Sequence, residues 1–240
     1  MKLKKWLMVS ALTAGVVLGG MAAEADSLTL SGGEVLDLGN TISVYDGERS
    51  FFGSQIHDWL IEGSPADSME KVLVKENVFP ENSTYAKELS ALATDVLKQG
   101  KVYQVRAAAN DTYYQGMVVS ISLTDSQQKQ LALYQKAALE NQASTEKDAL
   151  VQTLLTACQN QVTVTSASSW DEKKTASGLT YRTGDARVMW NRDGFTLPLY
   201  VKGMVMKEEG RTTYALLAGD QVSGEYLSSF FDTALKGAKK

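Results

Sequence analysis

The sequence predicts an α+β protein in which a mainly antiparallel sheet packs with amphipathic helices, in an α/β sandwich. Three observations lead to this prediction. Short stretches alternate apolar and polar side chains, as strands with one buried face do. Turn residues separate several of these stretches by only a few positions, which favours antiparallel hairpins. Other stretches carry apolar residues at helical spacing, and each apolar face needs a sheet to cover it.

The N-terminus has the composition of a secretory signal peptide, which we assign to residues 1–25. Lysines precede an uncharged apolar stretch over residues 6–23, and a small-x-small cleavage pattern follows. We expect cleavage between Ala25 and Asp26. The alternative is an uncleaved anchor, because about 18 apolar residues reach the lower limit for spanning a bilayer.

The mature chain is long enough to bury one substantial core. We expect a single α+β domain over residues 26–240, with a two-part organisation and a boundary near residues 161–178 as the alternative. The formal net charge of the whole chain is −4 at pH 7. Binding to a phosphate backbone needs clustered Lys and Arg, so we expect no nucleic-acid partner. We also expect no membrane span after cleavage.

The first half of the mature chain contains short strands, then a helix, a hairpin and a second helical region. Strands are expected at residues 28–30, 35–38, 41–45, 71–74, 102–108 and 113–123. Residues 51–60 fit a loop or a short helix. Helical spacing and a following glycine predict a helix over residues 83–99. Thr124 and Asp125 offer an N-cap for a helical region over residues 125–160, with a break near residues 141–145.

The second half of the chain contains a meander of strands and a closing helix. Strands are expected at residues 162–165, 179–182, 186–190 and 197–206, and from 211 to 218. A polar connection over residues 166–178 carries Trp170. Ser223 is expected to cap a helix over residues 223–236, and Gly237 to end it.

The strand from residue 197 shows the alternation most clearly. Leu199, Val201 and Val205 are expected on one side of it, and Tyr200, Lys202, Met204 and Met206 on the other. Pro198 belongs at the start of the strand or on an edge, because proline cannot donate to a ladder.

The order strand, turn, strand, helix occurs twice, over residues 102–141 and 199–235. One interpretation is an internal duplication. The other is that amphipathic hairpins resemble one another because all strands share one period.

The chain contains few reactive side chains, and we assign no catalytic residue, metal site or cofactor. His57 and Cys158 are the only histidine and cysteine, so they cannot supply a zinc site, and neither a nucleotide-binding loop nor a nucleophile elbow occurs. Carboxylates distant in sequence could still converge in a cleft. Asp46 and Glu48 are the nearest candidates, with solvated loop charges as the alternative interpretation. Asp185, Asp193 and Asp220 are interpreted as turn residues with backbone roles.

Three tryptophans are candidates for ligand binding: Trp59, Trp170 and Trp190. They fall in irregular segments or at strand edges, where amphipathic rings are useful for recognition. The alternative is that each ring closes an edge of the core.

The C-terminal unit resembles the last unit of the Mog1/PsbP-like fold. The resemblance rests on the strand over residues 199–206, the charged turn over residues 208–211, the strand over residues 214–218 with Gly219-Asp220, and a closing helix with Phe230 and Phe231. It implies an antiparallel sheet sandwiched by helices and a non-catalytic binding or assembly role.

These observations predict an exported, soluble, non-enzymatic binding or accessory protein that is secreted or periplasmic. Its partner would be a protein, a peptide or a glycan. The alternative is a carboxylate-dependent hydrolase that acts on an envelope or polysaccharide substrate.

Overall fold

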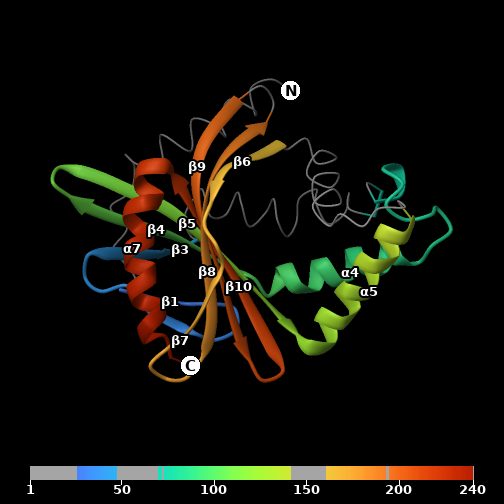
Figure 1. Ribbon diagram of the computed structural model, residues 1–240, viewed down its shortest axis with the longest axis horizontal. Helices are drawn as coiled ribbons and strands as arrows, with labels where there is room; N and C mark the ends of the chain where they lie inside the picture. The colour runs from blue at the N-terminus through green and yellow to red at the C-terminus, as the bar shows by residue number, and fades with distance from the viewer. Residues whose placement is uncertain (1–25, 48–69, 72, 142–160, 193–194, 240) are drawn as a thin grey trace.

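The computed structural model describes residues 26–47, 70–71, 73–141, 161–192 and 195–239 (Figure 1). Its helices include α4 (Tyr85–Lys98), α5 (Asp125–Asn141) and α7 (Gln221–Gly237). Its strands are β1 (Ser27–Thr29), β2 (Val35–Asp37), β3 (Ile42–Asp46), β4 (Lys101–Ala109), β5 (Thr112–Thr124), β6 (Gln161–Ala167), β7 (Asp171–Lys174), β8 (Thr180–Arg192), β9 (Phe195–Glu208) and β10 (Arg211–Asp220). All strand pairings among these elements are antiparallel, so the predicted α+β class is confirmed.

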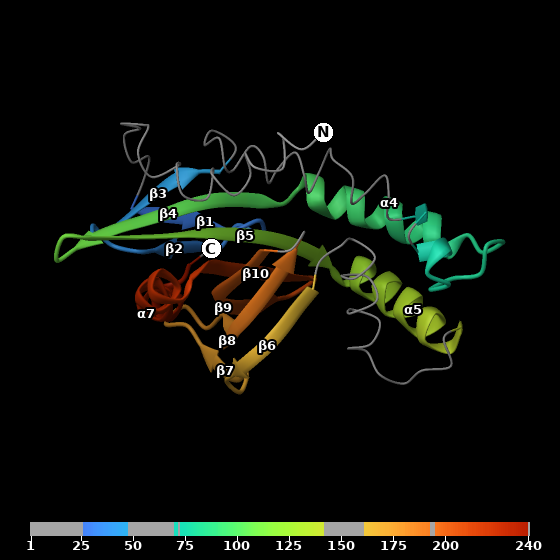
Figure 2. The same cartoon turned by 90° about the horizontal axis from the view of Figure 1, so that it is seen from above.

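One large sheet organises the described part of the molecule. Its strands follow the order β3-β4-β5-β10-β9-β8-β6, and β7 pairs with β8 next to the end of β6. The hairpins β4–β5 and β9–β10 meet in the middle, where β10 pairs with β5 from Arg211 opposite Thr124 to Gly219 opposite Gly116. Figure 2 shows that the strands on the β6 side are turned away from the line of β4 and β5, as sheet twist requires.

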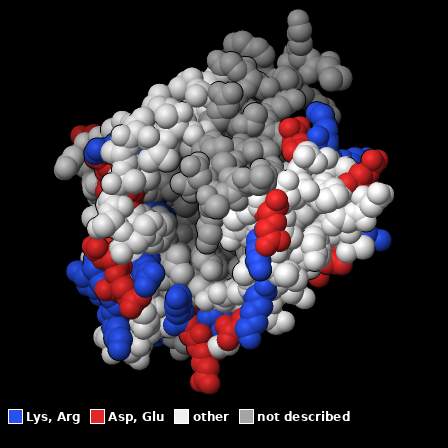
Figure 3. Space-filling model, turned by 45° about the vertical axis from the view of Figure 1, so that its right-hand side comes forward, with Lys and Arg blue, Asp and Glu red and all other residues white. Residues whose placement is uncertain are grey.

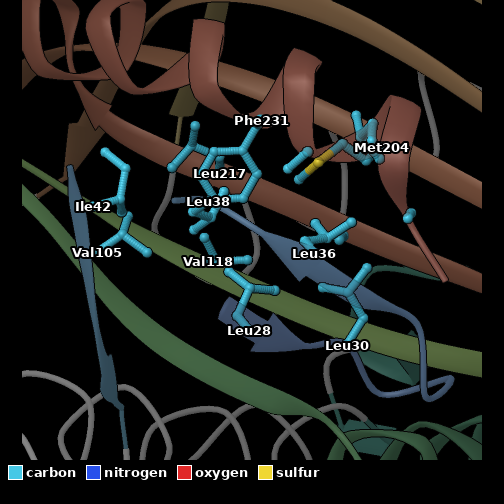
Figure 4. Close-up of a cluster of buried hydrophobic side chains, with 14 of the residues drawn as sticks. Leu28, Leu30, Leu36, Leu38, Ile42, Val105, Val118, Met204, Leu217 and Phe231 are labelled. Carbon is cyan, nitrogen blue, oxygen red and sulfur yellow. The ribbon is translucent and has the colours of Figure 1, made fainter. Parts of the chain in front are cut away.

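The two faces of the sheet have different coverings. We name the face that carries Lys202 and Leu217 the α7 face, because α7 packs on it against β5, β9 and β10. The β1–β2 hairpin covers the same face, so that leucines from this hairpin meet Leu217 and Phe231 in the main core (Figure 4). We name the opposite face, which carries Gly184, Gly203 and Leu216, the Trp170 face.

The alternation predicted for β9 is confirmed. Met204 and Met206 are buried on the α7 face, and Lys202 lies between them and Tyr200 on the same side. Pro198 pairs with Met189 of β8 but lies beyond Leu199, the last β9 residue that pairs with β10. The proline therefore sits where β9 has an open side, as its missing donor requires.

Helices α4 and α5 form a second, smaller core away from the sheet (Figure 1). Six buried residues make up this cluster: Leu73, Val78, Phe79, Ala86, Tyr134 and Ala138. The ring of Tyr85 lies between those of Phe79 and Tyr134, with centroid distances of 5.9 Å and 5.8 Å. Helix α4 runs close to its predicted range, and α5 begins at the predicted cap, where Thr124 and Gln127 exchange hydrogen bonds.

Several predicted boundaries are wrong. Leu73 and Val74 are helical rather than extended, because Leu73 packs in the α4–α5 core. The two short strands expected over residues 179–190 are one strand, β8, which pairs with β9 along its whole length. The polar connection contains a strand, β7, whose four charged residues are all exposed. Asp220, not Ser223, caps α7 by accepting from the backbone N–H groups of Val222 and Ser223 at 3.0 Å.

Some expectations fall on residues outside the described ranges. These are the leader over residues 1–25, Glu48, the segment 51–60 with His57 and Trp59, residues 142–160 with Cys158, and Asp193. Among the residues that are described, no helix combines the length and the apolar character needed to cross a membrane.

Candidate functional site

The candidate site is built around Trp170, which lies in the connection between β6 and β7. Its indole rests on Gly184 of β8 and Gly203 of β9, which face each other in the sheet. A Cβ atom at Gly203 would overlap Cη2 of the indole, and one at Gly184 would be 3.1 Å from Cδ2. Both glycines are therefore needed for the ring to lie directly on the backbone.

Backbone contacts hold the Trp170 segment in place. The N–H of Ser168 donates to the carbonyl oxygen of Asp185 at 2.8 Å. The N–H of Asp185 donates in return to Oγ of Ser168, also at 2.8 Å. This pair of hydrogen bonds ties the connection to the middle of β8, so the position of Trp170 depends on the sheet.

Two exposed side chains of β10 lie on the same face of the sheet as Trp170. Trp170 is 54% exposed, so part of the indole remains free for contact after the glycines cover the rest. Leu216 and Tyr214 of β10 are 43% and 37% exposed, and they lie opposite Gly203 and Val205 on the same face. Exposed aromatic and aliphatic residues on adjacent strands are typical of an interaction site.

Charged residues border this apolar surface. Arg182 lies opposite Val205, and its Nη2 is 2.7 Å from Oε2 of Glu172 on β7. In Figure 3, which turns the right-hand side of Figure 1 towards the viewer, Lys and Arg side chains lie beside Asp and Glu side chains along the edges of the visible face. An apolar centre with a charged border is the usual anatomy of a protein recognition surface.

The structure does not gather the predicted tryptophans into one site. Trp190 projects to the same face as Trp170, because it is six residues along β8 from Gly184. Six residues of strand correspond to about 20 Å, too far for one small ligand to contact both rings. Trp190 is half-buried and lies opposite Val162 and Leu197. Trp59 lies outside the described residues.

A buried charge cluster lies on the α7 face, behind the Trp170 surface. Lys202 is 0% exposed, and its Nζ is 2.9 Å from Oδ1 of Asp185 and 3.0 Å from Oδ1 of Asp232 on α7. A buried ammonium without anionic partners would be strongly destabilising. The lysine therefore binds α7 to the sheet through Asp232.

Asp185 is also held by two hydroxyl groups. Tyr200 donates from its hydroxyl at 2.7 Å, and the hydroxyl of Ser228 on α7 donates at 3.2 Å. Burial alone raises the pKa of Asp185, but the hydrogen bonds from Lys202 and Tyr200 and the lysine charge outweigh burial, and the pKa is lowered. Asp185 therefore stays ionised. The interpretation of Asp185 as a turn residue is wrong, because it lies inside β8.

The tyrosines around this cluster stay protonated. Burial, together with the hydrogen bond to Asp185, raises the pKa of Tyr200 to about 12. Burial, together with the charge of Asp232, also raises the pKa of Tyr181. Both phenols thus act as neutral groups, and Tyr200 serves as a hydrogen-bond donor at physiological pH.

Asp185 connects the two faces of the sheet. Its backbone holds the segment that carries Trp170, and its side chain holds Lys202 and α7. Sequence analysis placed Lys202 on the same side of the strand as Met204 and Met206 but did not identify its partners. A lysine at a core position of an alternating strand is the signal that an acidic partner lies nearby. The sequence does not show which acid this is.

The comparisons with known proteins give no family for this chain. No family model matches it, and neither does any curated protein. A protein of unknown function from Pseudomonas aeruginosa, PA94, described as a putative regulator, is similar at 10% identity with a TM-score of 0.33, over 56% of this chain and 79% of that one. The di-domain ARO/CYC BexL from the BE-7585A biosynthetic pathway is similar at 10% identity with a TM-score of 0.12, over 72% and 90%. These TM-scores define no shared fold, so function is inferred from the residues of this chain.

Proposed function

We propose that this protein is an exported, non-enzymatic binding or accessory protein that acts outside the cytoplasm and holds its partner on the Trp170 face. The main observation behind the proposal is the packing of Trp170 on Gly184 and Gly203. A large ring lies on two facing glycines, its segment is held by two hydrogen bonds between Ser168 and Asp185, and Trp170 is still 54% exposed. Burial of this ring by a partner would be favourable because its solvent contact is replaced by apolar contact.

Two sequence features support the same proposal. The leader over residues 1–25 has the pattern of a secretory signal peptide. The resemblance of the C-terminal unit to the Mog1/PsbP-like fold implies a binding or assembly role without catalysis. N-terminal sequencing of the protein recovered from outside the cytoplasm tests the export step. A first residue of Asp26 is expected, and an intact leader on a cytoplasmic chain would contradict it.

The binding role is tested with Trp170→Ala. The purified protein is titrated in a calorimeter with two kinds of soluble probe. One is an oligosaccharide of N-acetylglucosamine, and the other is an unfolded, carboxymethylated polypeptide. Binding of one probe, weakened at least about tenfold by Trp170→Ala, is expected. Tyr113→Ala is the matched control, because Tyr113 is 77% exposed at the start of β5, away from Trp170. Equal affinity of the Trp170 variant and the wild type would contradict the proposal.

One observation favours the hydrolase as a second candidate. Asp185 and Asp232 converge, as a pair of catalytic carboxylates must. Both, however, are bound to the same ammonium, and the lowered pKa of Asp185 does not suit a general acid. Turnover of cell-envelope polysaccharide by the wild type that is abolished in Asp185→Asn would establish the hydrolase in place of the binding protein.

A further inference from the structure

The β6 edge of the large sheet has a feature that the Trp170 site does not explain. Within the described residues β6 is the last strand of the sheet and pairs only with β8 (Figure 2). Its sequence over residues 161–167 contains no charge, no proline and no glycine, and four of its first five residues, at positions 162–165, are β-branched Val or Thr. The side chains of residues 163–167 are exposed.

Uncharged edge strands are unusual, because an exposed row of backbone donors and acceptors invites another strand. The neighbouring edge strand shows the ordinary protection. β7 has the sequence Asp-Glu-Lys-Lys, and all four of its residues are exposed. β3, at the opposite side of the sheet, places Ile42 and Val44 in the main core. Among the described residues, one protective device is found in β6, a register shift between Val164 and Ser166.

We propose that β6 binds an extended peptide segment of a partner protein by strand addition. This inference names the class of partner and rests on the binding role proposed above, but not on contact with Trp170. The added segment would hydrogen-bond to the outer backbone groups of β6. Its alternate side chains would lie beside Val162 and Val164, which project to the Trp170 face opposite Trp190 and Val188.

The chemistry of β6 defines the peptide. Val164 is 57% exposed, so an apolar or β-branched side chain beside it would cover surface that water now contacts. The absence of charge on β6 favours a segment that is uncharged at its centre, whereas the charges of β7 limit the docking edge at Asp171. A second copy of the chain fits less well. Two short strands pairing alone would bury far less than the roughly 1,000 Å² that a stable dimer needs.

The test uses as its probe a capped, uncharged synthetic peptide, Ser-Ile-Thr-Val-Ser-Ile-Thr, whose sequence differs from that of β6, so that its binding does not report self-pairing of β6. We expect saturable binding to the purified protein with a dissociation constant below about 1 mM, together with slowed amide exchange in β6. Two series of peptides, each methylated on alternate backbone nitrogens, distinguish the two hydrogen-bonding edges of the peptide. One methylated series should abolish binding and the other should preserve it, because only one edge pairs with β6.

Matched variants locate the binding edge. Val164→Lys should weaken peptide binding at least about tenfold, because it places a charge beside the added strand. Val222→Lys is the control, since Val222 is 66% exposed on α7 and the chemical change is the same. Both positions are exposed, so unchanged urea unfolding should show that both variants fold.

The outcomes separate this inference from the proposed function. Loss of binding in Val164→Lys, with Val222→Lys unchanged, supports strand addition at β6. No binding at about 1 mM, or equal binding by both lysine variants, overturns it. Probe binding that Trp170→Ala weakens, in a protein that does not bind the β-strand peptide, would keep the proposed function and overturn strand addition at β6. Self-association of the wild type by light scattering, abolished by Val164→Lys, would refute the peptide and identify a second copy as the occupant.

Discussion

The units β4–β5–α5 and β9–β10–α7 share an order of elements but send their helices to different places. Each consists of a hairpin followed directly by a helix of 17 residues. Their inner strands, β5 and β10, pair with each other at the middle of the sheet. Helix α7 returns across the sheet, whereas α5 continues beyond the end of β5 and packs against α4 (Figure 1).

The start of the helix does not explain this difference, because both helices are capped at the end of a strand. Thr124 and Gln127 form a reciprocal cap on α5. Asp220 caps α7 with its carboxylate. The caps fix where each helix begins, and the direction of each helix must come from the side chains that follow.

The two helices differ in the extent of their buried apolar stripe. Helix α7 buries large residues such as Leu227, Phe231 and Leu235 along its whole length. Helix α5 buries only Tyr134 and Ala138, while Leu131 and Leu133 are 40% and 51% exposed. A continuous stripe can cover a sheet, but two buried residues suffice only for contact with another helix. The duplication remains a hypothesis, because the two units diverge at the helix that would distinguish them.

The largest effect is expected for Phe231→Ala. Phe231 is 0% exposed at the centre of the α7 contact, so its truncation should lower the free energy of unfolding by about 4 kcal/mol in urea denaturation. Leu131→Ala on α5 is the control and should cost less than about 1 kcal/mol, because Leu131 is already partly exposed. Similar losses in both variants would remove the distinction between the helices.

The next effect concerns the buried lysine that only the α7 unit possesses. Asp185→Asn should lower the free energy of unfolding by about 3 kcal/mol, because it leaves the fully buried Lys202 with one anionic partner. Asp232→Asn should cost about 1 kcal/mol or less, because the side chain of Asp232 is 47% exposed. Urea unfolding of both variants measures the difference. A larger loss from Asp232→Asn would assign the main role to the helix carboxylate.

Low pH should weaken the contact between α7 and the sheet by protonating Asp185. The folded pKa of Asp185 lies below its ordinary value, so its ionised form contributes stability above about pH 4. That contribution should be lost as the pH falls through the folded pKa. The difference in unfolding free energy between the wild type and Asp185→Asn should therefore shrink from pH 6 towards pH 3. A difference that stays constant would show that Asp185 does not titrate in this range.

The smallest effect is expected in the α4–α5 core. The Tyr134 hydroxyl bonds Glu88 of α4, and burial together with Glu88 raises the pKa of Tyr134. Tyr134→Phe should lower the local stability of the helix pair by about 1 kcal/mol. Amide exchange should show faster opening of α4 and α5, with exchange in α7 unchanged. Equal acceleration in α7 would mean that the two cores open as one unit.

Local features of the sequence account for most of the fold. The glycine turn after residue 207 and the alternation of β9 located the C-terminal hairpin, and the spacing of apolar residues located α4 and α7. The errors arose where a contact distant in sequence decides the structure. Leu73 is helical because it joins a cluster with Tyr134, and β8 is continuous because all of it pairs with β9.

The candidate site was predicted only in part. Trp170 was identified from its residue type, but its seat depends on Gly184 and Gly203, which come together through strand register. Asp185 was misinterpreted because a short acidic residue beside a glycine has the same local pattern in a turn and in a strand. Its partners Lys202 and Ser228 are 17 and 43 positions away, so no local pattern contains them.

By itself the sequence determined the α+β class and the side of β9 on which each residue lies, because these follow from the apolar residues and from a period of two. The tertiary structure alone decided that α7 covers the sheet while α5 leaves it, that Trp170 lies on two glycines, and that β6 ends the described sheet with an uncharged edge. The physical reason is that periodicity fixes which side chains share a face. Only register and packing determine which faces meet.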